Sequence, residues 1–192
     1  MFTTDTEKLL AIHEHATSLM MIHGLIKPEP ADLSTYRPLN WLFKYDNAKC
    51  RFGGCNAGLL EISLSKPLCL ANFDEHYMKI VNTIKHEIAH ALVYERYEKS
   101  GYNRCKAHGR EWVEMCKVVG IEPVRCYDSS KVNNVEGKYH YRCPACDYEV
   151  YHFRLHKRVN SCGSCCDKYN NGKFSKEYIL QLVNVKGLVE TN

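Results

Sequence analysis

Two histidines and a glutamate lie within five consecutive residues near the middle of the 192-residue chain. His86, Glu87 and His90 form the pattern His-Glu-x-x-His, inside a stretch whose apolar residues recur at the three- to four-residue steps of a helix. Side chains four residues apart lie on one face of a helix, so both imidazoles can bind one metal ion. The pattern therefore predicts a hydrolytic zinc site in which Glu87, one residue along, is the general base for peptide hydrolysis.

A hydrolytic zinc site needs a third protein ligand, because its fourth position is left to water. His108 and Glu111 are the two candidates, and both would lie on one face of a second helix. Gly109 permits a close approach of the backbone beside His108, and Trp112 can pack one turn further on. These neighbours favour His108, whereas a glutamate 21 residues after His90 would also fit a thermolysin-type site.

Cysteines near the end of the chain form a second set of metal-binding residue types. Cys143 and Cys146 make one Cys-x-x-Cys pair, and Cys162 and Cys165 make another after fifteen intervening residues. Each pair turns two thiolates toward one ion, and four thiolates satisfy the tetrahedral preference of structural zinc. Cys166 leaves a Cys162/Cys166 pair open, although we favour Cys165. A redox role is the weaker alternative, since no thioredoxin-like pattern surrounds the pairs.

The segment between the two cysteine pairs alternates aromatic and basic side chains. It contains Tyr151, Phe153, Arg154, Lys157 and Arg158. This alternation fits a β-hairpin over residues 148–158, with rings that stack bases on one face and cations that hold phosphates on the other. We therefore expect single-stranded DNA or another nucleic acid to bind these five residues. The alternative is that the rings pack on a small core while the cations face water.

The composition is that of a folded chain, with 45% apolar and 25% charged residues. Eleven cysteines, an odd number, and no secretory signal favour metal binding over disulfides, and we expect an intracellular location. No apolar run reaches the roughly 18 to 20 residues of a membrane span, so we expect a soluble protein without a membrane partner. The net charge of +4 lies wholly in residues 137–192, where nine basic side chains meet five acidic ones. A polyanionic partner would meet that end.

Three helices are expected ahead of the cysteine-rich part. The first covers residues 6–26 and ends at a Lys-Pro-Glu-Pro run. The second begins at Asn72, where Asn72 and Glu75 resemble a capping box, and it carries the His-Glu-x-x-His motif as far as a Ser-Gly pair. The third begins near His108 and ends at Gly120.

Three short β-prone runs, residues 39–43, 51–55 and 60–64, precede the long helix and predict a small antiparallel three-stranded sheet. Together with the helices they predict an α+β, zincin-like metalloprotease core over residues 1–136. Residues 137–192 are expected to form a zinc-ribbon domain and tail, reached through a polar linker. Such a small unit has little core of its own, so metal binding would supply much of its folding free energy.

Three runs of sequence together resemble the SprT-like metalloprotease family. They are Ile-Ser-Leu-Ser-Lys-Pro-Leu at 62–68, His-Glu-Ile-Ala-His-Ala at 86–91 and His-Gly-Arg-Glu-Trp at 108–112. The resemblance covers roughly residues 39–120, and the cysteine-rich end resembles the zinc ribbon of many members. It implies that His86, His90 and His108 bind zinc and that Glu87 is catalytic. It also implies DNA-dependent proteolysis of proteins crosslinked to DNA.

We therefore expect a zinc-dependent endopeptidase with one catalytic and one structural zinc ion, acting on DNA-bound or DNA-crosslinked protein substrates. An alternative is a nucleic-acid-binding zinc-ribbon protein whose protease-like site is silent or differently used. An intact Glu87 beside both histidines of the motif argues against it. A third class, a structural scaffold with two zinc ions, would have no open coordination position.

Overall fold

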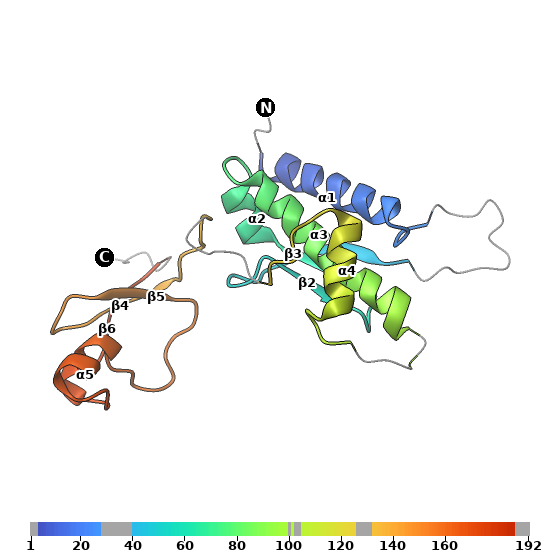
Figure 1. The fold of residues 1–192 in the computed structure, drawn as a ribbon. Coiled ribbons are helices and arrows are strands. Elements are labelled where there is room, and N and C mark those ends of the chain that lie inside the picture. Colours follow the sequence, from blue (N-terminus) through green and yellow to red (C-terminus); the bar gives the residue numbers. More distant parts are fainter. Residues whose placement is uncertain (1–3, 28–39, 100, 102–104, 126–131, 187–192) are drawn as a thin grey trace. The chain divides into compact units, whose positions relative to one another are not determined.

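The computed structural model describes residues 4–27, 40–99, 101, 105–125 and 132–186. The chain forms two compact units, Met1–Val135 and Glu136–Asn192. Each unit has its own three-stranded sheet and its own core, and the α+β class is confirmed (Figure 1). No helix in the described ranges is both long enough and apolar enough to cross a membrane.

The first unit combines a small sheet with several helices, one of which, α3 (Tyr77–Val93), lies against the others. In chain order its elements are α1 (Asp5–Ile22), β1 (Leu42–Asp46), β2 (Gly53–Asn56), β3 (Glu61–Ser65), α2 (Lys66–Asn72), α3 (Tyr77–Val93), the π-helical turn η1 (Tyr94–Glu98) and α4 (Arg110–Val119). Helix α1 buries Ile12, Ala16 and Met20 at four-residue steps, which is the apolar face of an amphipathic helix. The predicted first helix is thus confirmed, although it ends at Ile22, four residues before the predicted end.

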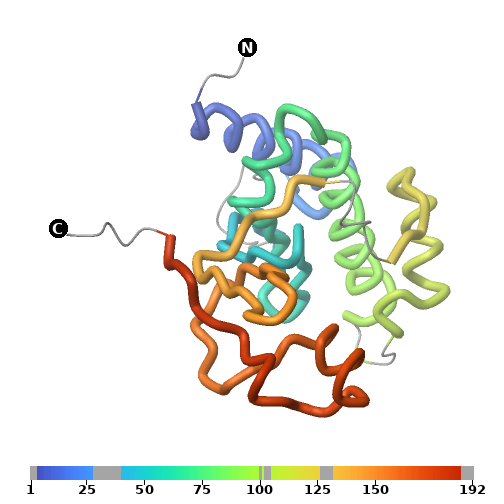
Figure 2. The backbone as a smooth tube through the Cα atoms, turned by 90° about the vertical axis from the view of Figure 1, so that its left-hand side faces the viewer, coloured from blue at the N-terminus to red at the C-terminus, as the bar shows by residue number. Residues whose placement is uncertain are grey.

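Helix α3, which carries the His-Glu-x-x-His motif, lies at the centre of the first unit. It contacts α1, α2, α4, β2 and β3, and the backbone trace shows it between α1 and α4 (Figure 2). Ile80, Ile84 and Ile88 are fully buried along its inner face. Helix α4 packs beside it and ends, as predicted, at Gly120, whose φ of 71° is the left-handed conformation that favours glycine. The motif therefore stands on a helix held by the core from several sides.

The sheet of the first unit is mixed, so the prediction of an antiparallel meander was wrong. Strands β2 and β3 form the expected antiparallel pair, but β1 pairs with β3 in parallel, and the strand order is β1-β3-β2. The loop after β1 is tied to Asp46, which accepts hydrogen bonds from Ala48 N and from the side chains of Arg51 and Ser63. This loop crosses the end of β3 and leaves β2 at the far edge of the sheet.

The expectation that one long helix begins at Asn72 was also wrong. Helix α2 ends at Asn72, and α3 begins at Tyr77 with no side-chain cap at His76. The fully buried side chain of Asn72 donates Nδ2–H to the carbonyls of Leu68 and Asn133 and accepts from the N–H of Asn133, all at 2.8 Å. Asn72 cannot cap α3 because its amide is bonded to a segment 61 residues away. We call this pairing the Asn72–Asn133 clasp.

The second unit is built on a sheet with order β5-β4-β6, all antiparallel. Its elements are β4 (Tyr139–Arg142), β5 (Glu149–His152), α5 (Gly163–Tyr169), the 3-10 turn η3 (Lys176–Tyr178) and β6 (Gln181–Val185). The predicted hairpin over residues 148–158 was wrong, because β5 pairs with β4 and residues 153–158 form neither helix nor strand. Part of the expected linker, residues 127–131, lies outside the described residues; residues 132–137 have no regular structure.

Candidate active site

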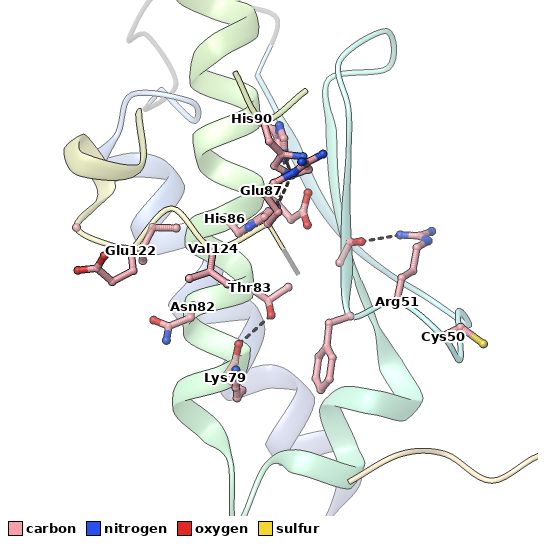
Figure 3. Close-up of a pocket in the computed structure, with 16 residues that line it drawn as sticks. Cys50, Arg51, Lys79, Asn82, Thr83, His86, Glu87, His90, Glu122 and Val124 are labelled. Atoms are coloured by element: carbon pink, nitrogen blue, oxygen red, sulfur yellow. Dashed lines mark hydrogen bonds between the residues drawn. The ribbon is translucent and has the colours of Figure 1, made fainter. Parts of the chain in front are cut away.

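Three histidine side chains converge at one face of α3. The Nε2 atoms of His86 and His90 are 3.3 Å apart. The Nε2 atom of His108 lies 3.2 Å from Nε2 of His90 and 3.3 Å from Nε2 of His86. His86 and His90 come from successive turns of α3 (Figure 3), and His108 comes from the turn that precedes α4. The structure thus brings together the three histidines that the sequence singled out.

The triangle of nitrogens fits a tetrahedral zinc ion. Zinc–nitrogen bonds of 2.0 to 2.1 Å at tetrahedral angles place the nitrogens about 3.3 to 3.4 Å apart, close to the observed separations. Glu111 is not part of this metal-binding group; one of its carboxylate oxygens lies beside Gly109. Of the two candidates for third ligand, the geometry therefore places His108, not Glu111, next to the pair on α3.

The indole of Trp112 supports all three imidazoles. Its ring centroid lies 4.9 Å from that of His86, 5.6 Å from that of His90 and 4.6 Å from that of His108. Trp112 is 1% exposed, so it forms the buried backing of the three rings. Packing on one rigid aromatic surface limits the rotamers of the imidazoles and holds their Nε2 atoms in one place.

Glu98 anchors the segment that leads to His108. It lies on η1, the continuation of α3, and accepts a hydrogen bond of 2.8 Å from the N–H of Cys105. The chain then turns, with a hydrogen bond from Gly109 N to Lys106 O, before α4 begins. This role of Glu98 has no signal in the sequence, because the contact joins a side chain to the backbone and requires no pattern of residue types.

Glu87 lies beside the histidines but is not one of the grouped metal-binding atoms. It is 8% exposed, and burial raises the pKa of its carboxyl to about 7, while the nearby charge of Arg51 opposes this rise. A carboxyl that titrates near neutral pH can both take and give up a proton, as a general base must. The residue thus has the position and the acidity of a catalytic base.

The imidazoles are held neutral. Burial, and next the charge of neighbouring histidines, lowers the pKa of both His86 and His90 to about 4. Burial also lowers the pKa of His108, with a smaller contribution from the positive charge of Arg125. Neutral imidazole is the form that binds metal, so at neutral pH no proton has to leave before an ion binds.

The histidines and Glu87 open into a cleft of about 740 Å³. Its floor is the face of α3 that carries the motif. Residues 50–53 line one wall, and residues 120–122, 124 and 125 line the other. Figure 3 shows Arg51 on the β2 side and Val124 on the opposite side, with His86 and His90 between them. The volume of this cleft lies within the range typical of ligand-binding clefts, about 300 to 1,000 Å³.

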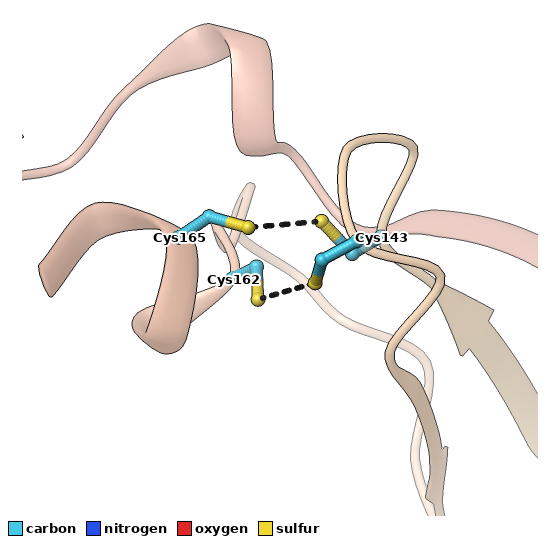
Figure 4. Close-up of side chains that lie close together, drawn as sticks. Cys143, Cys162 and Cys165 are labelled. Atoms are coloured by element: carbon cyan, nitrogen blue, oxygen red, sulfur yellow. Dashed lines mark hydrogen bonds between the residues drawn. The ribbon is translucent and has the colours of Figure 1, made fainter. Parts of the chain in front are cut away.

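The four predicted cysteine ligands converge in the second unit. The Sγ atoms of Cys143 and Cys165 are 3.8 Å apart, those of Cys146 and Cys162 are 3.7 Å apart, and all four lie within 4.8 Å of one another. Zinc–sulfur bonds of 2.3 Å at tetrahedral angles place sulfurs about 3.8 Å apart. Cys162 and Cys165, at the start of α5, face Cys143 (Figure 4), whereas Cys166 bonds to Ser161 and is outside the group. The donor set therefore fits a closed zinc site.

The residues proposed to contact nucleic acid are less closely grouped. Tyr151 stacks on His140 with centroids 4.4 Å apart, and Lys186 Nζ lies 5.5 Å from its ring centre. Phe153 is half-buried at the end of β5. The cations Arg154, Lys157 and Arg158 are exposed in the irregular segment that follows. One face of the Tyr151 ring is already stacked on His140, so a nucleotide base would have to stack beside that ring pair.

Comparison with known proteins gives one family. The model of the SprT-like family matches residues 38–140, a range that contains the three histidines and Glu87 and ends before Cys143. Protein SprT of Vibrio atlanticus (strain LGP32) is 30% identical over 102 residues, which are 53% of this chain and 56% of that protein. Protein SprT of Pseudomonas putida (strain W619) is 35% identical over 63 residues, 32% of this chain and 36% of that protein.

The chain aligns with about half of the first of these relatives and about a third of the second. No solved structure matches it. The zincin-like relationship of the core therefore stays a prediction, which the arrangement of α3 and the three histidines supports.

Proposed function

This chain belongs to the SprT-like family, and from that premise we propose that it is a zinc-dependent endopeptidase with Glu87 as catalytic base. The observation that carries the proposal is the set of three histidine nitrogens within 3.3 Å of one another, with the buried carboxyl of Glu87 beside them in one cleft. Three ligands leave a coordination position open to water, which distinguishes a catalytic site from the closed four-cysteine site.

A zinc ion held by His86, His90 and His108 would supply Lewis-acid activation of water and of the scissile carbonyl. The protein itself supplies the proton transfers. Glu87 accepts the proton of the attacking water and passes it to the departing amine. The packing of Trp112 behind the ligands keeps them oriented during this exchange.

We further propose that the substrates are DNA-bound or DNA-crosslinked proteins and that the second unit binds the nucleic acid. The support is electrostatic, since residues 137–192 carry the whole net charge of the chain. The exposed side chains of Arg154, Lys157 and Arg158 belong to this excess. Contacts of this kind are independent of base sequence and weaken as salt displaces them.

Glu87→Gln tests the catalytic assignment. The variant should keep its zinc, because Glu87 is not a ligand, and should lose cleavage of a basic DNA-binding protein, measured by gel electrophoresis with and without single-stranded DNA. Glu111→Gln is the matched control and should cleave as the parent does. Full activity in a zinc-loaded Glu87→Gln protein would overturn the assignment.

A further inference from the structure

The candidate active-site cleft extends along α3 well beyond the histidines. Lys79 lies seven residues before His86, which is about two helical turns and roughly 10 Å along the axis on nearly the same face. It lines the same cleft, and Figure 3 shows the stripe from His90 through Thr83 down to Lys79. A peptide that follows this floor in an extended conformation advances about 3.3 Å per residue. Lys79 is thus about three residues from the metal-binding nitrogens.

Among the charged side chains that line the cleft, cations outnumber acids. The cations are Arg51, Lys79 and Arg125. The acids are Glu87, which is buried, and Glu122, which is exposed. In Figure 3 the carboxylate of Glu122 points away from the histidines. The cleft therefore presents positive charge to whatever lies on its floor.

The three cations are not equally available. The guanidinium of Arg51 is bonded to Asp46 at 2.6 Å and to the carbonyl of Gly53 at 3.0 Å. Lys79 and Arg125 take part in none of the ion pairs that join described residues. Lys79 is half-buried, so water screens its charge less than that of a fully exposed lysine. Lys79 on the floor and Arg125 on one wall remain to bind an anion.

We propose that Lys79 and Arg125 form a subsite for an acidic side chain of the protein substrate, about two to four residues from the scissile bond. The proposal rests on the proposed endopeptidase function, since it concerns the same cleft. A carboxylate can accept from the ammonium of Lys79 and from the planar fork of Arg125. A basic side chain at that position would meet two like charges and bind less well. The subsite thus makes the enzyme selective for sequences with an Asp or Glu near the cleavage point.

The test uses a set of quenched fluorescent peptides that share one cleavable bond. A single Asp or a single Lys is moved through the four positions on either side of that bond, and kcat/KM is measured for each peptide with the zinc-loaded full chain. Asp should exceed Lys about five- to tenfold at one position two to four residues away. Equal rates for the Asp and Lys peptides at every position would overturn the subsite.

Charge reversal identifies the residues responsible. Lys79→Glu should invert the preference at that position, and Arg125→Glu should shift it in the same direction; Lys79→Gln should abolish it without introducing a new charge. Lys117→Glu is the matched control, because Lys117 is exposed on α4 and does not line the cleft. A preference for Asp that survives both Lys79 variants would contradict the proposal.

A binding measurement separates this proposal from the proposed function. Fluorescence anisotropy of the Asp and Lys peptides on zinc-loaded Glu87→Gln protein reads the subsite without cleavage. Tighter binding of the Asp peptide that Lys79→Glu reverses would support the subsite even if the parent cleaves nothing, in which case the endopeptidase function alone fails. Displacement of the peptide by an oligonucleotide that binds through Lys79 would instead make the cleft a nucleic-acid site and overturn the proposal.

Discussion

Gly53 lies directly against Glu87: a Cβ atom on Gly53 would come within 3.0 Å of both Cγ and Oε1 of the glutamate. The edge strand β2 thus approaches α3 with no side chain between them. Two consecutive glycines in a β-prone run are a sequence signal for such a close approach, although they do not say what is approached. The contact fixes where the carboxyl group of Glu87 can lie.

Gly53→Ala should impair catalysis while leaving the zinc in place. The new methyl group would also come within 2.8 Å of Thr83 Cγ2, so the side chains of both Thr83 and Glu87 have to shift. A displacement of about 1 Å at a catalytic group costs on the order of a hundredfold in rate, so a shift of the carboxyl by a few tenths of an ångström should lower the rate by a smaller factor. Measurement of kcat/KM together with zinc content checks this. Gly58→Ala, where the nearest atom would be 3.5 Å away, is the control, and an unchanged rate in Gly53→Ala would show that the contact is unimportant.

His108→Ala should weaken binding of the catalytic zinc ion, whereas Glu111→Ala should not. The nitrogen of His108 completes the triangle with the two histidines of α3, and Glu111 is outside the group. Competition with a chromophoric chelator gives the affinity of each variant. The opposite result would place Glu111 in the coordination sphere and require the turn before α4 to rearrange.

The purified chain should hold two zinc ions, and Cys143→Ser should lose one of them. Cys166→Ser should keep both, because the thiol of Cys166 is bonded to Ser161 instead of joining the other four sulfurs. Elemental analysis of the parent and both variants provides the counts. Loss of an ion from Cys166→Ser would mean that the second cysteine pair is Cys162 with Cys166.

The zinc-free protein should lose stability in acid. His86 and His90 have pKa values of about 4 when folded against an ordinary 6.5, so their contribution is complete above pH 6.5 and is lost as the pH falls toward 4. Glu87 opposes this, because its pKa of about 7 against an ordinary 4.5 stabilises the folded state at low pH, an effect lost as the pH rises through 7. Glu87→Gln should therefore steepen the loss between pH 6.5 and 4.5.

Urea unfolding of the chelator-treated chain at several pH values measures this effect. Trp41 and Trp112 are the two tryptophans of the chain, and both lie in the first unit, so indole fluorescence reports that unit alone. A zinc-free protein that becomes more stable as the pH falls from 6.5 to 4.5 would contradict the neutral burial of the imidazoles.

Asn72→Ala should destabilise the first unit by about 2 kcal/mol, because it leaves the N–H and C=O of Asn133 without their side-chain partner. Asn133→Ala is the matched control. It keeps the backbone groups that bond to Asn72 and removes only exposed contacts with Ala71 O and Glu75. Chemical denaturation followed by indole fluorescence compares them, and equal losses would show that the clasp depends on both side chains.

Much of the site could be predicted because its elements depend on local sequence. Apolar residues at helical spacing identify α3 and α4, and Gly120 marks the end of α4. The His-Glu-x-x-His spacing places His86 and His90 on one face whatever surrounds the helix. The sequence favours His108 over Glu111 as third ligand but leaves both open. The position of His108 depends on the contact between Glu98 and the backbone of Cys105, which no local pattern indicates.

Two of the wrong predictions concern contacts between segments that are distant in the sequence, and the third concerns the choice of strand partner. Strand existence could be inferred from short β-prone runs, but the parallel pairing of β1 with β3 depends on a loop tied to Asp46. Asn72 has the spacing of a helix cap, yet its side chain is hydrogen-bonded to the backbone of Asn133, 61 residues away. In the second unit the partner of β5 is β4, which lies ahead of the first cysteine pair. The alternation over residues 148–158 therefore did not indicate a hairpin within that segment.

The Asn72–Asn133 clasp also determines how its two positions can vary between related sequences. Asn133 contributes its backbone N–H and C=O, which every residue except proline can offer. Asn72 contributes an amide that both donates and accepts, at a position with no exposed surface. We therefore expect substitutions to be accepted at 133 and rejected at 72. Two residues in direct contact would then show no covariation, although their contact joins the ends of the segment that holds the three histidines and Glu87.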